Sequence, residues 1–147
     1  MKILVDADGC PVVDIVVRLS EKYGLPCLLL CDTAHEIIRE GAQTFVFDKG
    51  ADSVDYALVN KVQPGDIVIT QDYGLASLCL SRSAQVLHQD GWMYTRDNID
   101  ALLLVRHTSR KLRDSGCRMK GPKKRTQAQN DAFALSLENL LQTSVQG

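Results

Sequence analysis

Short apolar runs alternate with segments of helical periodicity along the whole chain, and this alternation limits the folds open to it. The first run spans residues 2–8 and leads into a helix that Pro11 opens and Gly24 ends. The next run, CLLLC at 27–31, is apolar throughout, as in parallel strands that are buried on both faces. We therefore expect a single three-layer α/β domain over residues 1–147, with a mostly parallel sheet flanked by helices.

The rest of the chain continues this alternation. Further strands are expected at 44–47, 66–70 and 84–87, and further helices at 51–62, 73–82 and 97–115. A last helix begins at Thr126, because Gln129 stands three residues later at the spacing of a capping box. Residues 32–41 fit either a helical turn or a loop, and residues 143–147 are expected to fray.

Composition and cysteine usage are those of an ordinary soluble domain without a membrane partner. The 147 residues are 45% hydrophobic and 24% charged, and no apolar run approaches the length of a membrane span. No signal peptide is visible, since Lys2 is followed by only three apolar residues before Asp6. The five cysteines are an odd number without disulfide or zinc-site spacing, so we expect reduced thiols in a cytoplasmic protein.

The net charge of −1 conceals an uneven distribution. Residues 1–95 carry seven basic and 13 acidic side chains, whereas residues 96–147 carry ten basic and five acidic ones. An acidic first part and a basic last third suit a metal site beside a surface that binds a polyanion. On charge alone, a solvated helix face with a basic loop explains the same pattern.

Two aspartates close the first apolar run and face the same way. Side chains alternate along a strand, so Asp6 and Asp8 lie on one face, about 7 Å apart at a rise of ~3.3 Å per residue. In parallel α/β sheets, ligands bind at the carboxyl ends of the strands. Two carboxylates there repel each other unless a cation or a proton lies between them, which favours a divalent-metal site. A pair of solvated turn residues is the alternative.

Three further aspartates are expected at the carboxyl edge of the sheet or near it. Asp72 closes the strand DIVIT, so it shares the carboxyl edge with Asp6 and Asp8 if the strands are parallel. Asp52 and Asp55 lie three residues apart at the start of a helix, on the side away from its apolar stripe. The helix dipole favours acidic residues at a helix N-terminus in any case, which explains these two without a function.

A set of carboxylates suits Mg²⁺ or Mn²⁺, which prefer hard oxygen ligands and keep several waters. Such ions bind phosphate oxygens, lower the pKa of a bound water and stabilise a leaving oxygen. Thr70 has a hydroxyl placed to orient a carboxylate or a water, although a buried strand threonine is the commoner case. Asp66 begins its strand at the opposite edge, where we expect a turn residue. No GxGxxG, P-loop or Ser-His-Asp spacing competes with this interpretation.

A basic run between the last two helices offers contacts to phosphate. Its candidate nucleic-acid-binding residues are Arg118, Lys120, Lys123, Lys124 and Arg125. The run contains no aromatic residue, so base stacking has to come from elsewhere, with Trp92, Tyr94 and Tyr73 as candidates. Ordinary packing of these rings, and a basic loop that only favours solubility, are the alternatives.

Four motifs make the chain similar to a known family. They are VDADGCPV at 5–12, GADSVDYALV at 50–59, GDIVITQDYGLA at 65–76 and KGPKKRT…ND at 120–131, and NIDALLLVRH at 98–107 fits as well. In this order, and over nearly the whole chain, they resemble the YaiI/YqxD family of bacterial proteins. Lys120-Gly121-Pro122 stands where that family has a GGP-like motif.

The resemblance implies a PIN-like domain. Active PIN-like members are Mg²⁺- or Mn²⁺-dependent nucleases with acidic clusters at the carboxyl edge of the sheet. Carried over residue by residue, this implies catalytic roles for Asp6, Asp8, Asp52, Asp55 and Asp72. The implied metal ligands are Asp6, Asp52 and Asp72, with Asp8 as a further ligand, and the implied cofactor is Mg²⁺ or Mn²⁺.

The leading interpretation is a divalent-metal-dependent phosphodiesterase that acts on RNA in preference to DNA. A protein that binds nucleic acid or another partner without turnover is the first alternative, and a metal titration separates the two. A DxD phosphatase, with Asp6 as nucleophile and Asp8 as general acid, is the second. Against it, Cys10 stands where such enzymes have Thr or Val. The sequence leaves the oligomeric state open.

Overall fold

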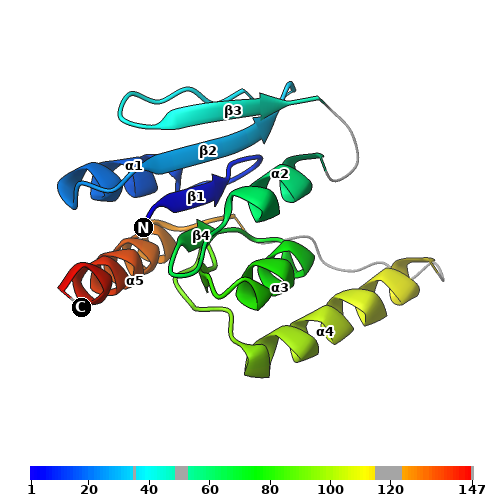
Figure 1. Ribbon diagram of the computed structural model, residues 1–147. Helices are drawn as coiled ribbons and strands as arrows, with labels where there is room; N and C mark the ends of the chain where they lie inside the picture. The colour runs from blue at the N-terminus through cyan, green and yellow to red at the C-terminus, as the bar shows by residue number, and fades with distance from the viewer. Residues whose placement is uncertain (35, 49–52, 115–123, 147) are drawn as a thin grey trace.

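Five strands form one sheet in which each strand is parallel to its neighbours, in the order β3-β2-β1-β4-β5 (Figure 1). This computed structural model describes residues 1–34, 36–48, 53–114 and 124–146. The strands are β1 (Ile3–Asp6), β2 (Cys27–Asp32), β3 (Gln43–Phe47), β4 (Ile67–Ile69) and β5 (Gln85–Leu87). The prediction of a mostly parallel α/β sheet is confirmed, and every predicted strand is present.

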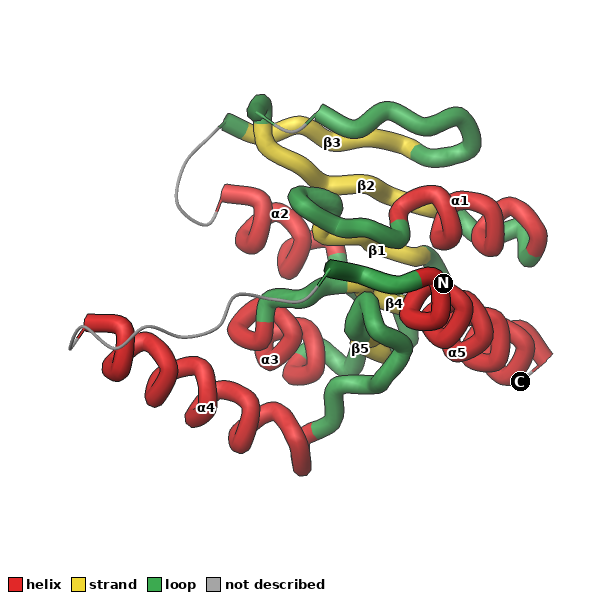
Figure 2. The backbone as a smooth tube through the Cα atoms, turned by 180° about the vertical axis from the view of Figure 1, so that it is seen from behind, coloured by secondary structure: helices red, strands yellow, loops and turns green. Residues whose placement is uncertain are grey.

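Helices cover both faces of the sheet and give three layers. They are α1 (Val13–Lys22), α2 (Ser53–Lys61), α3 (Tyr73–Ser81), α4 (Arg96–Asp114) and α5 (Gln127–Gln146). Helices α1 and α5 lie on one face, whereas α2 and α3 lie on the other, as two opposite views show (Figure 1 and Figure 2). Helix α4 packs on the outside of α3 and extends past the sheet. The predicted three-layer arrangement is therefore confirmed.

Alternation along the strands divides the buried apolar residues into two clusters. In β1, Ile3 and Val5 face α1 and α5, whereas Leu4 faces α2 and α3. Phe133 on α5 and Leu58 on α2 are fully buried members of the two clusters. Residues 3–5 are apolar without interruption because helices cover both faces of β1.

Local signals explain where two of the helices begin and end. Gly24 has φ +67°, the left-handed conformation that ends α1. At the start of α5, Gln129 N–H donates to Thr126 Oγ1 at 3.3 Å, and Thr126 N–H donates to Gln129 Oε1 at 2.8 Å. This is the predicted capping box. Helix α5 continues to Gln146, past residue 143 where we expected fraying, and the described residues between β2 and β3 form turns and loop rather than a helix.

Asp66 lies at the amino edge of the sheet, where the strands begin, and does more than form a turn. Its carboxylate accepts the Gln63 N–H at 2.9 Å and the Lys2 N–H at 3.1 Å. The Lys2 ammonium lies 2.6 Å from Asp66 Oδ2, and the Asp66 side chain is only 3% exposed. A partly buried ion pair therefore ties the start of β1 to the start of β4.

The longest described helices, α4 and α5, are not apolar enough to span a membrane. The other described helices are too short to do so.

Candidate functional site

The carboxyl edge of the sheet, where the strands end, brings two of the predicted aspartates together. β1 ends at Asp6, and its neighbour β4 is in register with it, Val5 opposite Ile69. Thr70 follows β4 directly and donates its hydroxyl hydrogen to Asp6 Oδ2 at 2.9 Å. The same Thr70 oxygen accepts the backbone N–H of Asp72 at 3.0 Å. Asp6 and Asp72 therefore lie at one edge and are connected through a single hydroxyl group.

Thr70 is fixed in this bridging position by burial. It is 2% exposed, and its carbonyl oxygen accepts the Tyr94 hydroxyl at 3.3 Å. A threonine hydroxyl has one hydrogen to donate, and here that hydrogen goes to the Asp6 carboxylate. Thr70 thus orients a carboxylate and is not only a buried strand residue.

Asp72 also has a structural role. It is the N-cap of α3, and its Oδ1 accepts the Leu75 N–H at 3.1 Å. A cap of this kind is worth about 1 kcal/mol to a helix. The bond keeps the side chain at the carboxyl edge, because turning away would leave a helical N–H without its partner.

Asp8 lies in the loop after β1 and reaches the end of β2. Its Oδ1 accepts the backbone N–H of Asp32 at 3.2 Å. Asp32 is the last residue of β2, and its own Oδ1 accepts the Ala34 N–H at 2.9 Å. We did not predict Asp32, although it follows CLLLC just as Asp6 follows the first apolar run. β2 therefore also ends in a carboxylate at this edge.

Helix α2 contributes Asp55, whereas the predicted ligand Asp52 lies outside the described residues. Asp55 stands in the first turn of α2, and its charge acts on the Asp6 carboxyl and on the Cys79 thiol. Leu58, one turn later, is fully buried against the sheet and holds the helix in place. Asp55 is thus a member of the same electrostatic group as Asp6.

The ionisation of Asp6 reflects this crowding of negative charge. The pKa of the Asp6 carboxyl is raised from 3.8 to about 6, with burial as the largest cause. The charges of Asp55, Asp72 and Asp8 raise this pKa further, and the hydrogen bond from Thr70 opposes them. Ionisation of Asp6 is therefore less favourable than that of a free carboxyl, and a positive charge near it would make ionisation easier.

Carboxylate oxygens are the ligand type that could hold an Mg²⁺ or Mn²⁺ ion that keeps much of its water. The ligand atoms at the edge are hard oxygens, which these ions prefer. Burial raises the pKa of the Cys79 thiol, so this sulfur stays protonated. Within the described residues, no three His, Cys, Asp or Glu side chains come together as a group that could hold a metal ion. Mg²⁺ does not need three such side chains, because proteins usually hold it through one or two carboxylates and several waters.

The basic run is described only at its end. Three of its predicted nucleic-acid-binding residues, Arg118, Lys120 and Lys123, lie outside the described residues. Lys124 is exposed. Arg125 is different, because its guanidinium group makes hydrogen bonds within the protein instead of pointing to solvent.

The rings considered for base stacking form one cluster beside the carboxyl edge. Tyr94 is 2% exposed, and its ring centroid lies 4.6 Å from that of Trp92 and 6.0 Å from that of Tyr73. His88 stacks on Trp92 at 4.3 Å with 12° between the ring planes. Tyr94 therefore serves packing and holds Thr70, whereas Trp92 and Tyr73 are partly exposed.

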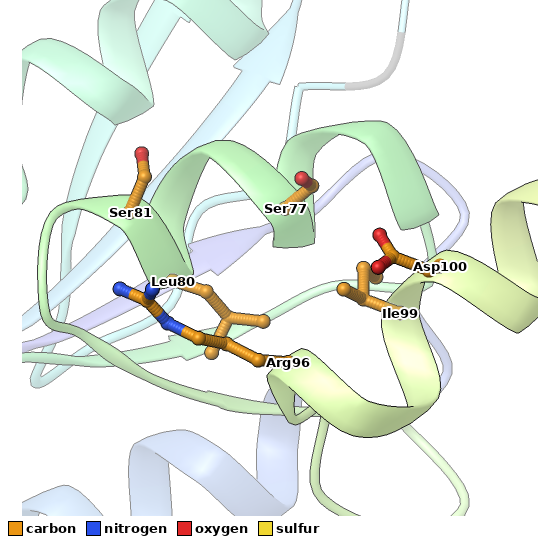
Figure 3. Close-up of a pocket in the computed structure, with 6 residues that line it drawn as sticks. All are labelled: Ser77, Leu80, Ser81, Arg96, Ile99 and Asp100. Atoms are coloured by element: carbon orange, nitrogen blue, oxygen red, sulfur yellow. The ribbon is translucent and has the colours of Figure 1, made fainter.

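A pocket of about 290 Å³ lies elsewhere, between α3 and α4 (Figure 3). It is lined by Ser77, Leu80, Ser81, Arg96, Ile99 and Asp100. Leu80 comes eight residues after Asp72, which corresponds to about 12 Å along the helix axis. None of the lining residues is a predicted site residue, so the pocket and the carboxyl edge are separate features.

Known proteins similar to this chain match nearly its whole length. The family model described as "Uncharacterized BCR, YaiI/YqxD family" matches residues 4–143. A UPF0178 protein of Exiguobacterium sibiricum is 52% identical over 141 residues, which cover 96% of each chain. UPF0178 proteins of Natranaerobius thermophilus (97% of each chain) and Clostridium acetobutylicum (96% of this chain, 97% of the relative) are 47% and 43% identical. No solved structure matches the chain. The chain belongs to the YaiI/YqxD family.

Proposed function

We propose that this protein is a divalent-metal-dependent phosphodiesterase that cleaves nucleic acid, RNA in preference to DNA, at the carboxyl edge of its sheet. The observation that carries the proposal is the Asp6 carboxylate, oriented by Thr70 within the field of three further aspartates. A nucleic-acid backbone is itself negative, so it can approach these acids only with a cation between them. A metal-bridged phosphodiester satisfies both sets of charges.

In this proposal Asp6, Asp52 and Asp72 hold Mg²⁺ or Mn²⁺, with Asp8 and Asp55 as further ligands or as groups that orient them. The ion would supply a water of lowered pKa and stabilise the leaving oxygen. Thr70 keeps one Asp6 oxygen fixed, which leaves the other oxygen as the metal ligand. The preference for RNA rests on the resemblance to PIN-like nucleases.

The basic run supports the second part of the proposal, the binding of a polyanion. The charge of Arg125, at the described end of the run, acts on the Cys10 thiol, and so does the charge of Asp6, so Cys10 lies within electrostatic range of both. Basic side chains that neutralise phosphates give affinity that falls steeply as salt rises. Lys124, which is exposed, and the run that precedes it are therefore proposed to hold the backbone.

We also propose that the protein works in the reducing environment of the cytoplasm. The four cysteines among the described residues are free thiols, and three of them are buried. This is how cysteines are commonly used where disulfides do not persist.

The test has a binding arm and a cleavage arm. Millimolar Mn²⁺ should raise the melting temperature of the wild type but hardly that of Asp6→Asn, because an amide is a much weaker ligand than a carboxylate. A 5′-labelled single-stranded RNA should be cleaved in Mn²⁺ or Mg²⁺ but not in EDTA, and Asp6→Asn should lower the rate by roughly 100-fold or more. Asp97→Asn removes an exposed acid at the start of α4 and should leave both results unchanged.

Two other outcomes of this test would support the alternative functions. RNA that binds in either metal without being cut would overturn the reaction and leave a non-catalytic binding protein. Phosphate release from a monoester, with a phosphoaspartate trapped at Asp6, would instead establish the DxD phosphatase.

A further inference from the structure

Arg125 ends the basic run in sequence but faces the interior of the fold. Its Nε donates to Asn130 Oδ1, one terminal nitrogen donates to Asp90 Oδ1, and the other donates to the Gln89 carbonyl oxygen. Each of these distances is 2.6 Å, and the side chain is 19% exposed. All three guanidinium nitrogens are therefore engaged, in the fork geometry that only arginine offers.

These bonds fasten the start of α5 to the loop after β5. Asn130 lies in the first turn of α5, whereas Gln89 and Asp90 belong to that loop. The two segments also fit closely at Gly91, which has φ +95°, and a Cβ atom there would lie 2.9 Å from the Ala132 carbonyl oxygen. Figure 2 shows this loop beside α5. The contact thus has a charged part and a steric part.

The same loop leads directly to the acidic group. His88, at its start, stacks on Trp92, and Trp92 packs against Tyr94. The Tyr94 hydroxyl donates to the Thr70 carbonyl oxygen, and the Thr70 hydroxyl donates to Asp6. A continuous series of contacts therefore runs from the site to the loop that Arg125 holds.

We propose that Arg125 is a positioning residue and not a phosphate ligand. By docking the start of α5 on the loop after β5, it fixes the position of Lys124, the exposed residue that precedes it. A nucleic-acid backbone that contacts Lys124 would then be held at a fixed place relative to the carboxylates. This inference rests on the proposed function, since it concerns how the same site holds its polyanion.

Removal of Asp90 separates the two possible roles, because they predict opposite signs. If Arg125 contacted phosphate, Asp90→Ala would free the arginine and remove a negative charge, so RNA would bind more tightly. If Arg125 positions the basic run, Asp90→Ala removes its anchor, and RNA should bind about tenfold more weakly despite the lost negative charge. Asp131→Ala is the matched control, since this exposed acid near the start of α5 accepts a hydrogen bond from Gln127 instead. It should leave affinity unchanged or slightly raised.

Two further variants disturb the contact between α5 and the loop after β5 without changing the net charge. Arg125→Lys keeps the positive charge, but a single ammonium nitrogen cannot replace three guanidinium nitrogens that each reach a different acceptor, so it should weaken RNA binding nearly as much as Arg125→Ala. Gly91→Ala should do the same, because the added methyl group meets the α5 backbone. Affinities are measured by fluorescence anisotropy with a labelled single-stranded RNA, below the melting temperature of each variant. Wild-type affinity in Arg125→Lys, or tighter binding in Asp90→Ala, would overturn the proposal.

Hydrogen exchange of the protein alone separates this inference from the function on which it rests. Amides of residues 88–93 and of the first turns of α5 should exchange faster in Asp90→Ala and Arg125→Lys than in wild type or Asp131→Ala. Wild-type protein that binds no RNA, together with this exchange pattern, refutes the proposed function and leaves the docking role of Arg125 standing. Unchanged exchange in both variants refutes the docking role, whatever the wild type binds.

Discussion

Asp6 is a residue whose ionisation opposes folding. Its pKa is raised from 3.8 to about 6, mainly by burial, so the folded protein binds this proton more tightly than the unfolded chain does. The resulting stabilisation is complete below about pH 4 and is lost as the pH rises through about 6. In EDTA at pH 7.5, Asp6→Asn should therefore be more stable than wild type by up to about 3 kcal/mol, and the gain should shrink toward zero near pH 4.

Urea denaturation of both proteins between pH 4 and 8 measures this difference. Asp97→Asn serves as the control, because its side chain is exposed and its effect should not vary over this range. A difference between wild type and Asp6→Asn that stays constant with pH would mean that the Asp6 pKa is not raised in the folded protein.

The placement of single residues shows which parts of the site were open to prediction. Asp6 and Asp72 follow apolar runs, and parallel strands bring such positions to one edge, so their proximity follows from the strand pattern. The inward orientation of Arg125 does not follow from a sequence pattern, because its partner Asp90 is 35 residues away. The basic run itself gives no sign of this pairing. Asp32 was missed because it stands alone, without a second aspartate or a glycine to mark it.

Helix α5 depends on its first turn, where Thr126 accepts the Gln129 N–H. Thr126→Ala removes this acceptor and should lower the free energy of unfolding by about 1 kcal/mol. Thr126→Ser keeps the hydroxyl group and should remain close to wild type. Thermal melts that find the serine variant as unstable as the alanine variant would show that the methyl group, and not the cap, matters here.

Elements were predictable where their signals are local. The capping box, Gly24 and the apolar runs each act over a few residues, so the strands and helices follow from them with ends shifted by a residue or two, except that α5 continues to Gln146. The pairing of Lys2 with Asp66 spans 64 residues and depends on the register between β1 and β4. No local pattern encodes that register. Asp66 was therefore predicted only as a turn residue, and its pairing with Lys2 was not predicted.

Across the whole molecule, the two ends of the sheet have opposite electrostatic character. At the amino edge a buried carboxylate, Asp66, is matched by Lys2 at 2.6 Å, whereas at the carboxyl edge like charges surround Asp6. The same change should therefore act in opposite directions. In EDTA at pH 7.5, Asp66→Asn should cost about 2 kcal/mol, because it leaves a partly buried ammonium without its counter-charge.

Urea denaturation of both single variants and of the double variant provides the measurement. The sites lie at opposite ends of β1 and share no partner, so the two effects should add to within about 0.5 kcal/mol. Destabilisation by both substitutions would contradict the contrast between the two edges.

The strand order has a consequence for where such a protein can act. From β1 the chain continues to α1 on one face of the sheet, whereas from β4 it continues to α3 on the other face. Neighbouring parallel strands whose continuations leave to opposite faces form a topological switch point, the position at which open α/β sheets receive their ligands. Asp6 and Asp72 stand on its two sides. The position of the proposed site is thus set by the path of the backbone. Changes in the surrounding loops would alter which ligand it could bind without moving that position.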